Sequence, residues 1–165
     1  MFKKDKLVGF INNEETMAYN WITNKNINSQ IGALTFPYKE NNYITLELSE
    51  LESKIVPNVT NKTDISFTIE IKKTVEIAEQ QQMKNFSSNE DVVHFIEEIE
   101  KIAESEIEGK IIQVLSKAQD EFQADIFGFG DMLNKKNPAV WTQMKKIGRL
   151  NFQTSHLIWM CKWKF

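Results

Sequence analysis

The stretch Ile65-Ser66-Phe67-Thr68-Ile69-Glu70-Ile71-Lys72 decides the fold class, because apolar and polar side chains alternate along it without a break. A period of two is typical of a β-strand with one face buried and the other in water. The chain before this stretch holds a short amphipathic helix over Glu14–Ile22 and several other extended segments. We expect strands at about 6–11, 27–36, 43–48 and 53–57, with Lys39–Asn42 as a hairpin loop.

After residue 87 the hydrophobic period changes from two to between three and four. Ser87 and Glu90 have the spacing of a helix capping box, and apolar residues then recur on one helical face as far as Phe122. We expect a helix of about 36 residues, about 50 Å long. Strands followed by a long helix favour an α+β fold. The expected architecture is an antiparallel or mixed sheet with one long amphipathic helix packed on a face and smaller helices at the ends.

Composition excludes several classes of function. The chain has 165 residues, 41% hydrophobic and 26% charged, with a net charge of −3 and no basic block, so we expect no nucleic-acid partner. No apolar run is long enough for a transmembrane segment. One cysteine, Cys161, and two histidines permit no internal disulfide and leave little for a metal site. We expect no catalytic constellation, cofactor or bound metal.

The segment Asp125-Ile126-Phe127-Gly128-Phe129-Gly130 ends the long helical run, and Pro138 and Trp141 begin another helix. Two glycines and two aromatic residues so close together do not form an ordinary helix interior. We favour a packed turn joining two helices, with at least one phenylalanine in the core. An exposed aromatic pair would instead mark a partner site. Phosphate binding is a weak alternative, because no strand precedes the glycines and no Lys-Ser/Thr pair follows them.

Two other sets of side chains suggest chemistry, and for each we favour a plainer interpretation. Three acids near the helix end resemble paired catalytic carboxylates but are more typical of a capping network: Glu121, Asp125 and Asp131. One histidine has carboxylates within a helical turn, as in some zinc sites, but it lies on a Glu-rich face typical of solvent: His94, with Glu97 and Glu98.

Several of these segments together carry a resemblance to a known family. They are Phe2–Phe10, Glu15-Thr16, Trp21, Ser53–Pro57, Lys117–Gln119, Asp125–Gly130 and Pro138-x-x-Trp141. On these residues the chain resembles the C-terminal, third domain of the Ger(x)C subunits of spore germinant receptors. No single segment is specific, but the set as a whole is.

The resemblance implies a non-enzymatic role in germination. Ger(x)C subunits are lipid-anchored on the outer face of the inner spore membrane and act with the A and B membrane subunits. No catalytic or cofactor residues are established for the family. The resemblance therefore implies a structural or interface role for the motif Asp125–Gly130 with Pro138 and Trp141. The alternatives are a germinant-binding domain with a pocket lined by Trp21 and Tyr43, or a non-functional fragment.

The C-terminal tail departs from the family pattern. Residues 1–146 match an incomplete domain, whereas residues 147–165 contain no Asp or Glu and follow neither a helical nor a strand period. A single base lost from an A-rich run encoding Lys145-Lys146-Ile147 would explain the change, and restoring it gives an alternating strand. As written, the tail is expected to lack that strand and to leave a sheet edge open. A role for Trp159, Cys161 and Trp163 as an anchor is then disfavoured.

The start of the chain also departs from the family. Family members begin with a lipoprotein signal, a lipidated cysteine and two further domains, and this sequence starts where the third domain starts. We therefore expect a truncated copy, which would be cytoplasmic if made as written.

Overall fold

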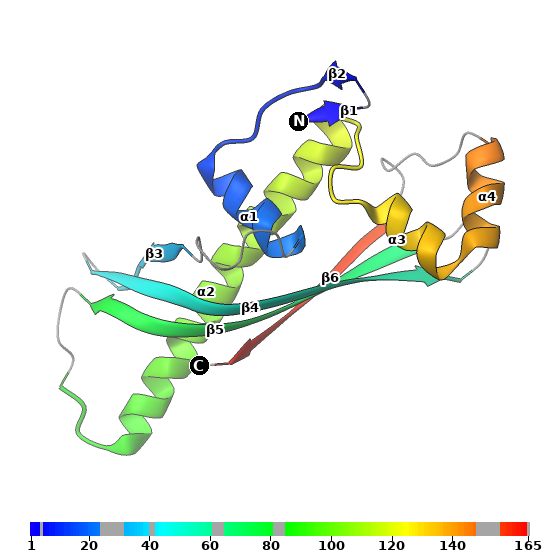
Figure 1. Ribbon diagram of the computed structural model, residues 1–165. Helices are drawn as coiled ribbons and strands as arrows, with labels where there is room; N and C mark the ends of the chain where they lie inside the picture. The colour runs from blue at the N-terminus through cyan, green and yellow to red at the C-terminus, as the bar shows by residue number, and fades with distance from the viewer. Residues whose placement is uncertain are drawn as a thin grey trace.

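Four strands form one mixed β-sheet (Figure 1). The computed structural model describes residues 1–3, 5–23, 32–39, 42–60, 65–80, 85–147 and 156–164. In spatial order the strands are β3 (Ala33–Pro37), β4 (Tyr43–Val59), β5 (Ile65–Gln80) and β6 (His156–Lys164). β3, β4 and β5 pair antiparallel, and β6 lies parallel to β5.

The alternation that predicted β5 is confirmed. Ile65, Phe67, Ile69 and Ile71 are buried, and the residues between them are not. β4 differs from the prediction, because segments 43–48 and 53–57 belong to one strand of 17 residues. Register shifts at Thr45/Leu46 and at Leu48/Glu50 allow β4 to stay paired with β5 where its alternation breaks.

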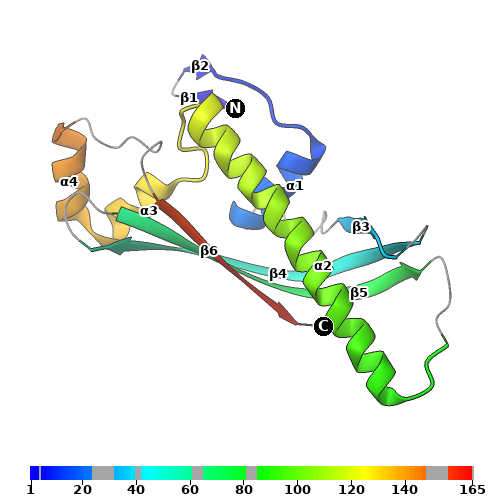
Figure 2. The same ribbon diagram turned by 180° about the vertical axis from the view of Figure 1, so that it is seen from behind.

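The helices are α1 (Asn13–Thr23), α2 (Asn89–Ser116), α3 (Phe129–Lys136) and α4 (Pro138–Ile147). A π-helical turn, η1 (Lys117–Glu121), continues directly from α2. Figures 1 and 2 show that α2 crosses one face of the sheet, with α1 beside it. Seven apolar residues along α2 are buried: Phe95, Ile99, Ala103, Ile107, Ile111, Val114 and Leu115. The predicted α+β class, with a long helix packed on a sheet, is confirmed.

The start of α2 was predicted one residue too early. The N-cap is Ser88, whose side chain accepts a hydrogen bond from the Asp91 N–H (3.2 Å), and the Asp91 carboxylate accepts one from the Ser88 N–H (3.1 Å). Aspartate can accept the returning hydrogen bond of a capping box as glutamate does, so Ser88 and Asp91 form the box. The predicted pair, Ser87 and Glu90, is therefore wrong. The α-helix also ends at Ser116 rather than continuing to Phe122.

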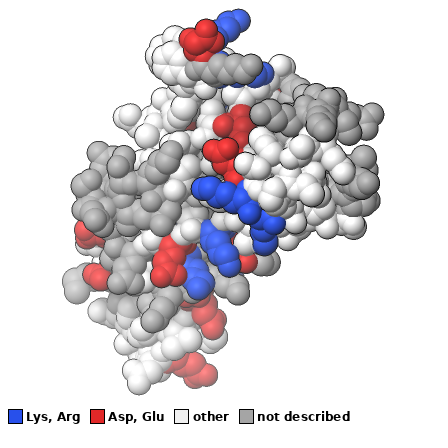
Figure 3. Space-filling model, turned by 45° about the vertical axis from the view of Figure 1, so that its right-hand side comes forward, with Lys and Arg blue, Asp and Glu red and all other residues white. Residues whose placement is uncertain are grey.

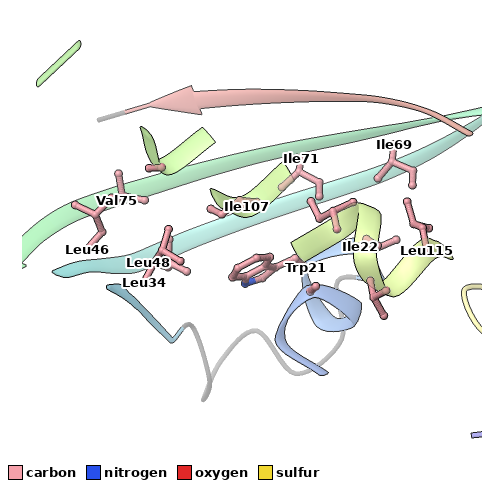
Figure 4. Packing of buried hydrophobic residues seen from close by; sticks show 14 of the residues in the cluster. Trp21, Ile22, Leu34, Leu46, Leu48, Ile69, Ile71, Val75, Ile107 and Leu115 are labelled. Carbon is pink, nitrogen blue, oxygen red and sulfur yellow. The ribbon is translucent and has the colours of Figure 1, made fainter. Parts of the chain in front are cut away.

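The core lies between the sheet and the two helices α1 and α2. In Figure 4 Trp21 and Ile22 of α1 and Ile107 and Leu115 of α2 point toward apolar side chains of β4 and β5. One inward position of β5 carries a charge, because Lys73 is only 1% exposed. Its Nζ lies 3.3 Å from the centre of the Trp21 ring, a cation–π contact that helps to offset the burial of the ammonium group.

The two ends of the chain correct two expectations. The strand expected over residues 6–11 is reduced to β2 (Lys6–Leu7), which pairs with β1 (Phe2–Lys3) in a separate hairpin. The tail expected to lack a strand forms β6, which occupies the β5 edge from Ser66 to Thr74. A ladder joins backbone groups, so it does not require alternating side chains. The base loss near Lys146 stays a prediction that sequencing of the gene decides.

The helix junction as candidate functional site

The Asp125 carboxylate organises the segment between η1 and α3. Its Oδ1 accepts hydrogen bonds from the N–H groups of Gly128 and Phe129 (2.9 Å each), and its Oδ2 accepts one from Gly130 (2.7 Å). The N-cap of α3 is Gly128, which has no side chain to bond these amides. Asp125 therefore supplies the cap from three residues earlier, and its charge suits the positive end of α3.

The two glycines of this segment serve different purposes. Gly128 has φ +82°, in the left-handed region where L side chains are strained, although a Cβ there would meet no atom within 4 Å. Gly130 lies within the first turn of α3, and a Cβ there would lie 2.8 Å from the Trp141 ring. Gly128 is thus required by the backbone, and Gly130 by the approach of α4 to α3.

A line of aromatic rings connects the junction to α1 and to the sheet. Ring centres are 5.5 Å apart for Tyr19 and Phe127, 5.6 Å for Phe127 and Phe129, and 4.8 Å for Phe129 and Phe67. Phe127 and Phe129 are both buried, and Ile126 packs partly buried against the same core. The aromatic residues of the segment therefore pack α3 against the core and do not form a surface patch.

A partly buried ion pair joins α1 to η1. Lys117 Nζ lies 3.0 Å from both carboxylate oxygens of Glu15. Glu15 also closes a capping box with Asn12, since each accepts a 2.8 Å hydrogen bond from the other's backbone N–H. Burial on its own would raise the pKa of Glu15, but the Asn12 N–H and the Lys117 ammonium outweigh it and hold that pKa below its ordinary value.

The π-helical turn brings the N-terminal segment into the junction. The Phe122 N–H donates to the Lys117 carbonyl (3.0 Å), which widens the helix by one residue. Gly9 then packs on the Phe122 ring so closely that a Cβ would lie 2.3 Å from a ring carbon. Sequence reasoning did not identify these contacts of Gly9 and Glu15, although Asn12-x-x-Glu15 has the spacing of a capping box.

The other candidate sites have different surroundings. The three amides of this turn already donate to the Asp125 carboxylate, so they are not available to a phosphate. The other two acids, Glu121 and Asp131, are exposed. His94 Nδ1 lies 3.5 Å from Glu97 on an exposed face, with the histidine side chain 72% accessible. In the described ranges no three His, Cys, Asp or Glu residues gather as metal ligands would. The side chains of Trp159, Cys161 and Trp163 lie outside the described residues.

Trp21 and Tyr43, which were expected to line a pocket, have different surroundings. Trp21 is buried in the core, whereas Tyr43 is 48% exposed on β4. Among the described residues, an open hollow of about 440 Å³ lies at the N-terminal end of α2. It is lined by aromatic rings and by charges of both signs: Phe86, Phe95, Lys39, Lys101, Glu97 and Glu98.

The surface charge is mixed. Figure 3 shows basic side chains near the middle of one face, with acidic side chains on either side of them. A nucleic-acid interface usually presents a broad basic stripe, and this face has none among the residues shown in colour. None of the helices in the described part of the chain is both long and apolar enough to span a bilayer.

Fold and junction together define a mixed-sheet α+β domain in which the motif residues make internal contacts. The chain belongs to the family described as "Spore germination B3/GerAC like, C-terminal", whose model matches residues 1–153.

Two curated relatives come from Bacillus subtilis (strain 168). Spore germination protein YndF is 27% identical over 143 residues, which is 87% of this chain and 34% of that protein. Spore germination protein B3 is 26% identical over 141 residues, which is 86% of this chain and 36% of that protein. The chain therefore spans about a third of the length of these relatives.

A solved structure shares the fold. The match to the crystal structure of the GerBC protein has a TM-score of 0.77 and 25% sequence identity, and it covers 97% of this chain and 47% of that chain. This family is one of spore germination proteins and not a known enzyme family. The predicted resemblance is confirmed, including its assignment to the C-terminal domain.

Proposed function

We propose that this chain is the C-terminal domain of a C-type subunit of a spore germinant receptor and acts through association with the A and B membrane subunits. The family match over residues 1–153 is the observation that carries this proposal. The motif Asp125–Gly130 with Pro138 and Trp141 would act as the structural support of the domain, because its side chains bond and pack internally. Partner contacts would then use other, exposed surfaces. The parent protein would be held at the outer face of the inner spore membrane.

A co-purification experiment tests this role. The chain would be immobilised and exposed to detergent extracts of membranes that contain the A and B subunits from the same organism. We expect at least one subunit to be retained by the wild type and by the control Gly109→Ala, since Gly109 has no neighbour to displace. Gly130→Val, which disrupts the junction, should retain neither. Failure of the wild type to retain A or B above an unrelated domain would contradict the proposal.

The hollow at the start of α2 favours a second candidate function, direct binding of a small molecule. Its volume of about 440 Å³ is within the usual range for ligand sites. The Tyr38 hydroxyl donates to Glu98 (2.5 Å), and Lys39 lies 3.3 Å from the same carboxylate, so these polar groups are held in place. Rings of Phe86 and Phe95, 5.3 Å apart, provide an apolar surface beside them.

Nuclear magnetic resonance titration separates the two functions. Free amino acids and monosaccharides would be added to the chain while the amide shifts of residues 85–101 are followed. Binding should move these shifts in a saturable way and should weaken in Glu98→Gln but not in Glu104→Gln, which lies outside the hollow. Unchanged shifts at 10 mM of every compound would exclude this candidate for those two classes of ligand.

A further inference from the structure

The N-terminal hairpin carries a concentration of exposed apolar side chains. Phe2 is 65% exposed, Leu7 46% and Phe10 76%, so three large apolar groups face water within nine residues. In Figures 1 and 2 this hairpin lies beside the C-terminal end of α2, away from the sheet. Scattered apolar residues are normal on a surface, but a group confined to one projecting element indicates a contact site.

The hairpin is an ordered part of the domain. The Met1 ammonium donates to the Gly9 carbonyl (2.7 Å), and the Val8 N–H donates to the Met1 carbonyl (3.0 Å). Gly9 is in turn packed on the buried Phe122 ring. The apolar side chains are therefore held out in water by a fixed backbone, and the hydrophobic effect favours any partner that covers them.

The register separates apolar from basic side chains. Phe2 pairs with Leu7, and Lys3 pairs with Lys6. Directly opposite residues share one face of a hairpin, so the two apolar side chains lie on one face and the two lysines on the other. Like charges directly opposite each other are unfavourable. An anionic partner would offset the repulsion between Lys3 and Lys6.

These features specify the chemistry of the partner. It must offer an apolar layer to Phe2, Leu7 and Phe10 and anionic groups close to that layer. Residues 1–10 contain three lysines and one aspartate, although the whole chain has a net charge of −3. The nearby turn η1 carries exposed Asp120 and Glu121, so the hairpin is the part of this end that attracts an anionic surface. A bilayer containing anionic lipids presents both requirements across its headgroup boundary.

We propose that the hairpin formed by residues 1–10 binds the surface of an anionic lipid bilayer, with Phe2, Leu7 and Phe10 entering the interface and Lys3 and Lys6 contacting the headgroups. The attachment is peripheral and reversible, since three side chains bury little area. It orients the domain with the C-terminal end of α2 toward the bilayer.

Vesicle sedimentation tests this proposal with the untagged chain. Vesicles of phosphatidylcholine with 30% phosphatidylglycerol are compared with pure phosphatidylcholine at low salt. We expect the chain to bind the anionic vesicles at least tenfold more tightly than vesicles of pure phosphatidylcholine. This binding should weaken as salt is added. The double variant Phe2→Ser/Phe10→Ser should lose at least tenfold in affinity. Its control, Val93→Ser/Ile77→Ser, removes two exposed apolar residues of α2 and β5 that lie away from the hairpin and should bind as the wild type does.

A charge-matched pair tests the basic face. Lys3→Glu/Lys6→Glu and Lys135→Glu/Lys136→Glu make the same change in net charge, but only the first pair lies in the hairpin. The hairpin pair should abolish binding, while the α3 pair should weaken it less than threefold. Circular dichroism confirms that each variant is folded. The proposal would be overturned if the wild type did not bind the vesicles, or if each variant and its control lost the same affinity. If the wild type did not bind, a protein would be left as the partner of the hairpin.

Discussion

The two ends of α2 use the same kinds of side chains with different degrees of burial. At the C-terminal end, the Glu15 side chain of the Glu15–Lys117 pair is only 5% exposed, and Lys117 Nζ lies 5.7 Å from the centre of the Phe122 ring. At the N-terminal end, the Lys39–Glu98 pair is more than half exposed, at 56% and 52%, beside an open hollow. A buried charged pair fixes geometry, whereas an exposed pair contributes little to stability. The comparison indicates that charged groups near η1 take part in internal packing, whereas the charged pair beside the hollow is open to solvent.

The largest effect is expected for Gly130→Val. The added Cβ would lie 2.8 Å from the Trp141 ring and 3.2 Å from the Asp125 carboxylate, so the packing of α3 on α4 must change. We expect a loss of about 3 kcal/mol in the free energy of unfolding, measured by urea denaturation. Gly109→Ala is the control and should gain up to about 1 kcal/mol, because it fills open space within a helix. Equal stability of wild type and Gly130→Val would show that the junction is not tightly packed.

Asp125→Ala is expected to rank second. It removes the acceptor of three amide hydrogen bonds at the start of α3, two of them from the buried residues Phe129 and Gly130. The free energy of unfolding should fall by about 2 kcal/mol. Asp131→Ala, at an exposed position of the same helix turn, should cost less than about 1 kcal/mol. Similar losses in the two variants would mean that charge near the helix end, and not the cap, is responsible.

Lys117→Met tests the partly buried Glu15–Lys117 pair through the pH dependence of stability. The pKa of Glu15 is lowered in the folded protein, so its stabilisation is complete above the ordinary glutamate pKa of about 4.3 and is lost as the pH falls through the lower, folded value. Without Lys117, burial would raise that pKa. We expect the variant to be about 2 kcal/mol less stable at pH 7, with a smaller difference near pH 3.

The control for this pair is Lys110→Met. Its partner Glu14 lies 3.1 Å away but is 65% exposed, so the loss should be less than about 1 kcal/mol. A difference between wild type and Lys117→Met that does not change from pH 7 to pH 3 would contradict the role given to Glu15.

The smallest effect is expected at the hollow. His94→Gln removes an exposed contact with Glu97 and should change the free energy of unfolding by less than about 0.5 kcal/mol. A loss as large as that of Lys117→Met would remove the distinction between the two ends of α2.

Much of the fold could be predicted because it depends on hydrophobic period. The alternation from Ile65 to Ile71 and the helical spacing from Phe95 to Leu115 each identify a buried face. The length of β4 could not be predicted in the same way, because its two register shifts are set by pairing with β5. The β6 strand was also not predicted. Its ladder to β5 joins backbone groups, so the strand forms without the alternating side chains by which a strand is identified in a sequence.

The candidate site was predicted only in part. The glycines and rings of Asp125–Gly130 indicated a packed turn, because few other structures accept that composition. The partners of this turn could not be found by local patterns. Lys117 lies 102 positions from Glu15 along the chain, and the Gly9 contact with Phe122 depends on the π-helical turn. The buried Lys73 likewise depends on the Trp21 ring brought to it by α1.

Amide hydrogen exchange at Phe129 and Gly130 measures whether the motif Asp125–Gly130 is a cooperative structural junction. Both amides belong to buried residues and donate to the carboxylate of Asp125, which is itself exposed. We expect these amides to exchange only through global unfolding, with the same denaturant dependence as the amides of Ile107 and Ile111 in the core of α2. Exchange that is orders of magnitude faster than in α2 and insensitive to denaturant would show that the motif opens locally and is not a cooperative junction.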